Sequence, residues 1–129
     1  MKIYRGDYDR KEFYSIMGKF FAEPEYQKLM PYLNNSSNDT WIIKETDGEV
    51  IAFLSYSESK ELINIKSCYY HKISDAKQIV TKILKRNTKP CKTIILKENS
   101  KLIHLFMKDF KFQQTKETKN YIFLRRESQ

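Results

Sequence analysis

The sequence has few of the residues that build metal sites and disulfide frameworks. Its 129 residues include only two cysteines and two histidines. Cys68 and Cys91 lie outside any CxxC or Cys/His ligand spacing, which predicts buried free thiols and neither a zinc site nor a disulfide. His71 and His104 are far apart in the sequence, which argues against a metallohydrolase. We therefore expect no metal ion.

Long apolar runs are also missing. No stretch approaches the roughly 18 apolar residues that a membrane-spanning helix needs. The N-terminal residues 1–7 lack the apolar segment of a signal peptide. We expect a soluble, cytoplasmic protein.

The composition favours one folded domain with a positive surface. Hydrophobic residues make up 40% of the chain and aromatic residues 14%, which is enough to build a core. These values exclude a disordered chain, collagen and a coiled coil, and we expect residues 1–129 to form a single domain. The net charge is +8, from 24 basic and 16 acidic residues. This charge favours anionic partners such as nucleotides, nucleic acid or the phosphates of a coenzyme.

The first half of the chain predicts a strand, two helices and an antiparallel meander. Residues 1–8 are expected to form a strand, and Asp9 and Glu12 have the capping-box spacing of a helix start. Pro24 is expected to open a second, short helix, because proline suits the first turn. Strands are predicted at residues 41–46, 50–56 and 62–70, and Asp47-Gly48 marks a two-residue hairpin turn between the first two of them.

The second half alternates helices and strands. A helix is expected from Ser74 or Asp75, either of which is a good N-cap, and a strand at residues 91–96. Asn99 or Ser100 should cap the last helix, and strands near residues 111–115 and 120–125 end the chain. The order is β-α-α-β-β-β-α-β-α-β-β. We expect the strands at 62–70 and 91–96 to be parallel neighbours joined by the helix between them.

This order, with the Asp47-Gly48 turn between the second and third strands, resembles the GNAT superfamily of acyl-CoA-dependent N-acetyltransferases over the whole chain. Local similarities lie at residues 48–53, 99–112 and 120–126. The resemblance implies an α+β fold, with a mixed and mainly antiparallel sheet of about seven strands flanked by about four helices.

The family's pyrophosphate loop, Gln/Arg-x-x-Gly-x-Gly/Ala, is altered in this sequence. The match is residues 71–76, where Ser74 replaces the first glycine and His71 replaces Gln or Arg. An alternative alignment extends the fourth strand through Tyr70 and leaves the loop several residues short. The resemblance implies acetyl-CoA as cosubstrate, bound by His71, Lys72, Ile73, Ser74, Asp75, Ala76, Lys77, Asn99 and Phe106. The physical basis would be an anion at a helix start.

The family's general acid, a tyrosine on the last helix, is also replaced. Alignment on Asn99 places Phe106 at that position, and alignment on Phe112 places Met107 there, and neither side chain donates a proton. The remaining candidate acids are Tyr69, Tyr70, His104 and water. The candidate bases near the turn between strands three and four are Glu58 and Glu61.

Three functions remain open from the sequence. The first is an N-acetyltransferase that transfers an acetyl group from acetyl-CoA to an unidentified amine. The second is a GNAT-like binding or regulatory module without catalysis, and the third is a basic nucleic-acid-binding domain. The resemblance implies that residues 10–33 and 57–60 contact the acceptor, where Glu23 and Glu25 could attract a cationic amine. The protein is expected to be a monomer or a homodimer.

Overall fold

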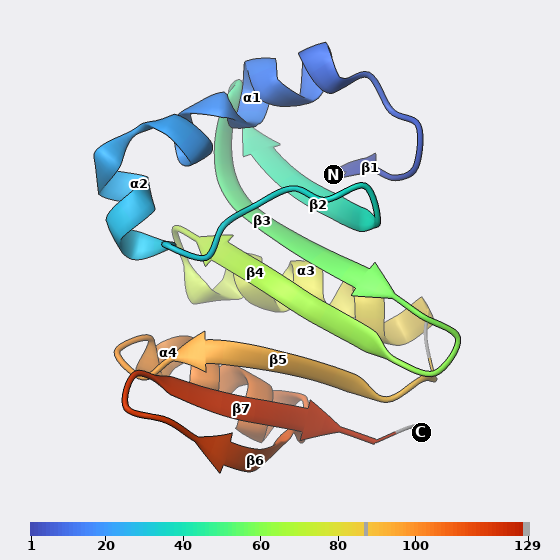
Figure 1. The fold of residues 1–129 in the computed structure, drawn as a ribbon, viewed down its shortest axis with the longest axis vertical. Coiled ribbons are helices and arrows are strands. Elements are labelled where there is room, and N and C mark those ends of the chain that lie inside the picture. Colours follow the sequence, from blue (N-terminus) through green and yellow to red (C-terminus); the bar gives the residue numbers. More distant parts are fainter. Residues whose placement is uncertain (87, 128–129) are drawn as a thin grey trace.

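The fold of the chain is a seven-stranded sheet with helices on both faces (Figure 1). The computed structural model describes residues 1–86 and 88–127. Its elements are β1 (Lys2–Tyr4), α1 (Arg10–Ala22), α2 (Pro24–Leu29), β2 (Asp39–Thr46), β3 (Glu49–Glu58), β4 (Ile63–Tyr70), α3 (Ile73–Arg86), β5 (Cys91–Leu96), α4 (Ser100–His104), a π-helical segment (Leu105–Asp109), β6 (Gln113–Glu117) and β7 (Tyr121–Arg126). The sheet order is β1-β2-β3-β4-β5-β7-β6. The predicted order of elements is confirmed.

Local sequence signals set several element boundaries as predicted. The Asp9 carboxylate accepts hydrogen bonds from the backbone N–H groups of Lys11 (3.0 Å) and Glu12 (3.2 Å), so α1 begins at the predicted cap. Pro24 is the first residue of α2. Asp47 and Gly48 both have positive φ, 53° and 78°, as the tight turn between β2 and β3 requires.

Several strands begin or end one or two residues from the predicted positions, such as β2 at Asp39 and β6 at Gln113. Two other boundaries differ for a clear physical reason. β1 ends at Tyr4, four residues early, because Gly6 turns the chain with a φ of 64° before the cap of α1. α3 begins at Ile73, so neither Ser74 nor Asp75 is its N-cap. Asp75 lies inside the first turn, where its carboxylate binds Lys44 on β2.

The sheet separates two hydrophobic cores, as alternation along its strands requires. On one face, α1 and α2 pack with β1 to β3 around Phe13, Trp41 and Phe53, all fully buried. On the other face, α3 and α4 cover a larger core that runs from β2 to β7; in Figure 1 these two helices lie behind the sheet. Among the described residues, no helix is both long enough and apolar enough to cross a membrane.

Candidate functional site

The parallel pair β4–β5 separates after three residue pairs. The pairs are Ile63 with Cys91, Asn64 with Lys92, and Ile65 with Thr93. Towards their C-terminal ends the two strands diverge and leave an opening between them. The predicted parallel pairing is therefore confirmed over a short stretch at the start of both strands.

A β-bulge at Lys66 accounts for the divergence. On the neighbouring strand, Tyr56 lies opposite Ile65 and Ser55 lies opposite Ser67, so Lys66 is an extra residue in β4. A bulge bends its strand and increases the local twist. The bulge comes directly after the last residue of β4 that pairs with β5, so it turns β4 away from β5.

Polar contacts hold the bulge in place. Thr93 Oγ1 donates a hydrogen bond to the carbonyl oxygen of Ile65 (3.2 Å), at the point where the strands separate. On the other side of β4, the buried hydroxyls of Ser55 and Ser67 bond to each other. The Lys66 ammonium contacts both carboxylate oxygens of Asp39, at 3.0 and 2.9 Å, and the Asp39 side chain is fully buried. The separation is therefore built into the sheet.

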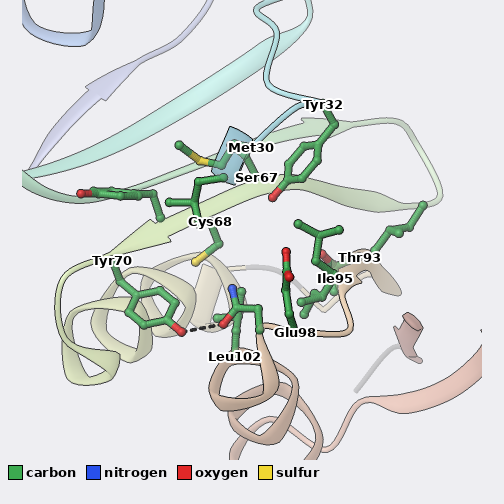
Figure 2. A pocket seen from close by; sticks show the side chains of 14 residues that line it. Met30, Tyr32, Ser67, Cys68, Tyr70, Thr93, Ile95, Glu98 and Leu102 are labelled. Carbon is green, nitrogen blue, oxygen red and sulfur yellow. Dashed lines mark hydrogen bonds between the residues drawn. The ribbon is translucent and has the colours of Figure 1, made fainter. Parts of the chain in front are cut away.

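A pocket of about 300 Å³ lies between the separated strand ends (Figure 2). Residues of β4, β5 and the start of α4 line it, together with α2 and the segment that follows α2. The lining consists of Leu29, Met30, Tyr32, Ser67, Cys68, Tyr69, Tyr70, Thr93, Ile94, Ile95, Leu96, Glu98, Asn99 and Leu102. It is mainly apolar, with a few polar groups directed inwards, as is typical of small-molecule sites.

Two polar side chains that the sequence analysis did not identify point into this pocket. Figure 2 shows the Tyr32 hydroxyl and the Glu98 carboxylate directed into the space between β4 and β5. Among the described residues, neither group has a hydrogen-bond or ion-pair partner. Desolvation raises the pKa of Tyr32 to about 12. The available signal for Glu98 was its position directly before Asn99, but the pocket forms only when the strands are placed together.

Cys68 lies in the same pocket but does not have the properties of a nucleophile. Burial raises the pKa of its thiol to about 12, so the thiol keeps its proton at neutral pH. Nucleophilic cysteines require the thiolate. The Cys68 thiol is therefore not a candidate nucleophile.

Two of the predicted acids, Tyr69 and Tyr70, line the pocket. The Tyr70 hydroxyl donates a hydrogen bond to Asn99 Oδ1 (2.6 Å), and burial raises the pKa of Tyr70 (Figure 2). The Tyr69 hydroxyl is 3.1 Å from Nε2 of His71, and burial raises the Tyr69 pKa to about 12. Asn99 stands at the N-cap position of α4 but its side chain does not cap the helix, since it binds Tyr70 instead.

The structure places the other predicted catalytic residues away from the pocket. Glu58 ends β3 opposite Ile63, at the start of β4, whereas the pocket is at the other end of β4; it forms an ion pair with Lys89. Glu61 follows in the exposed turn between β3 and β4. His104 is exposed at the end of α4.

The connection between β4 and α3 agrees with the alternative alignment, in which the loop before the helix is several residues short. β4 continues through Tyr70, and only His71 and Lys72 separate it from α3. Asp75 places a negative charge at the start of α3, and the Lys44 ammonium compensates it at 2.7 Å from Oδ1 of Asp75. This hydrogen bond holds the pKa of Asp75 below its usual range, and Lys72 lowers it further. Lys77 pairs with Asp109 at 2.9 Å.

The last helix contains an extra residue that explains the two competing alignments. Residues Leu105–Asp109 form a π-helical segment, closed by a hydrogen bond from the Phe110 N–H to the Leu105 carbonyl (3.3 Å). A π turn holds one more residue than an α turn, which matches the one-residue difference between Phe106 and Met107. Phe106 is fully buried, 4.9 Å from the ring of Phe112, and Met107 is 38% exposed. Neither lines the pocket.

A metal site is not seen in the part of the chain that the structure describes. Within residues 1–86 and 88–127, no group of three or more His, Cys, Asp or Glu side chains is placed to hold a metal ion.

Comparisons with known proteins identify the fold. No family model matches the chain, and no curated protein matches it. Among solved structures, an acyl-CoA N-acyltransferase from Pseudomonas aeruginosa has a TM-score of 0.72 at 14% identity, covering 97% of each chain. The Campylobacter jejuni N-acetyltransferase PseH in complex with acetyl coenzyme A has a TM-score of 0.62 at 13% identity, covering 99% of this chain and 100% of PseH.

A GNAT family acetyltransferase from Elizabethkingia anophelis with acetyl-CoA bound has a TM-score of 0.66 at 12% identity, covering 98% of this chain and 97% of the other. The chain therefore has the fold of the GNAT acetyltransferases, in a divergent sequence. The predicted α+β class, with its mainly antiparallel seven-stranded sheet and four α-helices, is confirmed.

Proposed function

We propose that this protein is an N-acetyltransferase that transfers an acetyl group from acetyl-CoA to an amine. The observation that carries the proposal is the opening between β4 and β5, which leads into a pocket of about 300 Å³. Separated strands leave backbone N–H and C=O groups without strand partners, and an extended arm with amide groups can bind there in the manner of an added strand. The pantetheine arm of acetyl-CoA is such an arm.

The similarity in fold also supports the proposal, because it extends to proteins that bind acetyl-CoA. PseH and the Elizabethkingia enzyme both hold acetyl-CoA in their solved structures. Their identities to this chain are 13% and 12%, so the reaction is inferred from the pocket together with the fold.

The chemistry requires a base for the amine and an acid for the leaving group. The amine nitrogen attacks the thioester carbonyl carbon, a C–N bond forms and the C–S bond breaks. The substrate ammonium loses one proton before the attack and the nitrogen loses a second as the amide forms; the thiolate takes up one, and solvent receives the other. Backbone N–H groups of β4 beyond the bulge would stabilise the oxyanion, since β5 no longer pairs with them.

We assign the acid to a pocket tyrosine, with Tyr32 as the first candidate. The raised pKa of Tyr32, about 12, means that its hydroxyl is protonated at neutral pH, which is the form that a general acid requires. The Tyr32 hydroxyl has no partner among the described residues, whereas that of Tyr70 is bonded to Asn99. Tyr69 and Tyr70 are the alternatives on β4, and His104 and Glu58 are not proposed because they lie elsewhere.

The coenzyme phosphates are expected at the start of α3. The helix N-terminus and Lys72 supply positive potential there. Asp75 does not oppose it, since Lys44 compensates its charge. His71, Ile73, Ser74, Ala76 and Lys77 complete the expected binding segment, while Asn99 borders the pocket on its other side.

The proposal is tested by calorimetry with acetyl-CoA on two variants at one position. Cys68→Phe fills the pocket with a ring and should abolish binding, with thermal unfolding used to show that the variant folds. Cys68→Ala leaves the pocket open and should retain both binding and turnover. Acetyl-CoA binding that is equal in Cys68→Phe and the unmodified protein would place the coenzyme elsewhere and reject the proposal.

A non-catalytic module is the second candidate, favoured by the two-residue connection before α3 and by the phenylalanine and methionine in place of the helical tyrosine. It predicts acetyl-CoA binding without release of free thiol in the presence of any amine. Thiol release that depends on an amine would exclude it.

A further inference from the structure

We infer that the acceptor is a primary amine carried on an apolar, ring-sized body, with its ammonium at Glu98 and its body in a groove over β5 and β7. The inference rests on the proposed acetyl transfer and names the substrate class of that site. Three observations lead to it: a second hollow, the apolar side chains exposed in it, and the charge of the single carboxylate beside it.

The second hollow lies on the sheet face that α1 and α2 leave open. These helices pack over β1 to β3, and in Figure 1 no helix lies in front of β5, β7 and β6. The hollow has a volume of about 380 Å³ and is lined by Tyr32, Asn64, Ile65, Lys66, Ile94, Tyr121 and Phe123. It shares Tyr32 and Ile94 with the pocket between β4 and β5, so the two hollows adjoin and form one groove.

Apolar side chains are exposed along this groove. Ile94 is 44% exposed, Tyr32 36% and Leu29 52%, and they are three of the large hydrophobic side chains that the described surface leaves in water. Tyr121 and Phe123 are half-buried on the same face of β7. A cluster of exposed apolar side chains marks an interaction site. Burying these side chains under an apolar ligand is favourable.

The charged side chains that line the groove favour a ligand with one positive charge. Among the residues lining either hollow, Glu98 is the one carboxylate and Lys66 is the one cation. Lys66 is engaged by both oxygens of Asp39, whereas Glu98 has no partner among the described residues. Glu98 points into the pocket where the thioester would lie (Figure 2). With the thioester in that pocket, an ammonium group bound to Glu98 would lie beside the reacting carbonyl.

Other classes of acceptor fit the groove less well. A polyamine or a basic peptide needs several carboxylates, and an amino sugar needs several hydrogen-bonding side chains. Beyond Glu98 and the engaged Lys66, the hollow over β7 offers Asn64 and the tyrosine hydroxyls as polar groups. The ring of Phe123 also lines this hollow, and the Lys116 ammonium lies 5.2 Å from the ring centre. A ring or short branched body matches this surface.

Glu98 has two roles in this arrangement. It holds the ammonium, and it accepts the proton that the nitrogen must lose before attack. A positioned base is typically worth about a hundred- to ten-thousand-fold in rate. Glu98→Gln should keep the size of the side chain and remove both roles.

The test begins with binding in the absence of acetyl-CoA, so that its result is independent of turnover. NMR titration with 2-phenylethylamine should shift the signals of Ile94, Glu98 and Phe123. 2-Phenylethanol, which lacks the ammonium, should bind at least tenfold more weakly, and spermidine should not bind more tightly than the aromatic amine. Glu98→Gln should remove the preference for the amine over the alcohol.

Kinetics with acetyl-CoA give the second part of the test. Ile94→Ser and Phe123→Ser should each raise the KM for 2-phenylethylamine about tenfold, as is typical for lost apolar contacts in a pocket. Phe123 lines the hollow over β7 and not the pocket between β4 and β5, so Phe123→Ser should leave the acetyl-CoA affinity unchanged. Met107→Ser, at a similarly exposed residue outside the groove, and Glu61→Gln, at an exposed carboxylate elsewhere, are the matched controls.

The inference is overturned if spermidine binds more tightly than 2-phenylethylamine, if the signals of the groove do not move, or if Glu98→Gln binds amine and alcohol as the unmodified protein does. A failure of acetyl-CoA to bind, with amine binding at the groove intact, would overturn the proposed transfer and leave the amine site standing.

Discussion

The Tyr70 hydroxyl on β4 and the Asn99 side chain before α4 are joined by a hydrogen bond of 2.6 Å across the opening between β4 and β5. The two residues come from elements whose backbones no longer pair at this level of the sheet. This bond therefore closes one side of the pocket that the strands leave open. Because it uses the Asn99 side chain, it also explains why Asn99 does not cap α4.

Tyr70→Phe should lower the free energy of unfolding by about 0.5–1.5 kcal/mol, the usual net contribution of one hydrogen bond. The Asn99 amide loses its partner and becomes free to move at the pocket. Urea unfolding measures the change. Tyr121→Phe, whose hydroxyl has no hydrogen-bond partner among the described residues, is the control and should be neutral. Equal losses in both variants would contradict a specific role for the bond.

Lys72→Glu should weaken acetyl-CoA binding, and the loss should shrink as salt is raised. The side chain lies in the two-residue connection before α3, where the phosphates are expected, and charge interactions at an exposed site are screened by ions. Calorimetry at low and high salt measures the effect. Lys60→Glu, in the turn at the other end of β4, makes the same charge change and should leave binding nearly unaltered. Unchanged affinity in Lys72→Glu would place the anion elsewhere.

Asp75→Asn should destabilise the protein at neutral pH and flatten its acid unfolding. The pKa of Asp75 is held below its usual value by Lys44, so the pair stabilises the fold above the unfolded-state pKa, and this contribution is lost as the pH falls through the folded-state pKa. A hydrogen bond to a charged group contributes about 1.5–3 kcal/mol. Thermal unfolding from pH 7 to about 2 measures both changes.

Asp109→Asn is the matched control for Asp75→Asn. Asp109 also pairs with a lysine, at 2.9 Å, but both side chains are exposed, at 37% and 56%. Exposed ion pairs contribute little to stability. If Asp109→Asn destabilised the protein as much as Asp75→Asn, burial of the Lys44–Asp75 pair would not be the reason for its effect.

Tyr32→Phe should slow acetyl transfer and leave acetyl-CoA affinity nearly unchanged, because it removes a proton donor and keeps the ring in the pocket. A pKa of about 12 means that the rate should not fall between pH 7 and about 10 through loss of this proton. Steady-state thiol release across this pH range measures both. A rate in Tyr32→Phe equal to that of the unmodified protein would move the role to Tyr69 or Tyr70.

Phe106→Tyr should not restore a general acid, although the sequence alignment on Asn99 predicts that it would. The Phe106 ring is fully buried against Phe112, so an added hydroxyl would lack a partner, at a cost of about 1–3 kcal/mol. Met107→Tyr, at a 38% exposed position, should be tolerated without a gain in rate. Urea unfolding and thiol release measure the two expectations. Faster transfer in either variant would contradict the placement of this helix.

Local signals in the sequence determined the elements and their order. Asp9 caps α1, Pro24 starts α2, and Asp47-Gly48 forms the turn with two positive φ values, because each of these acts through its own backbone or its nearest neighbours. The helix between β4 and β5 likewise indicated a parallel pair, since such strands need a long crossover. The α+β fold follows from these elements.

The candidate site was decided by the tertiary structure. The bulge at Lys66 is visible only in the pairing of β3 with β4, and it opens the pocket that brings Tyr32 and Glu98 together from segments 66 residues apart. The sequence analysis predicted Glu58 as a catalytic base, but Glu58 pairs with Ile63 at the start of β4, and the pocket lies at the other end of that strand. The N-cap of α3 was predicted at Ser74 or Asp75, but the helix begins at Ile73, and the Asp75 carboxylate instead binds Lys44, 31 residues away. Contacts between distant segments fix these positions, and no local pattern encodes them.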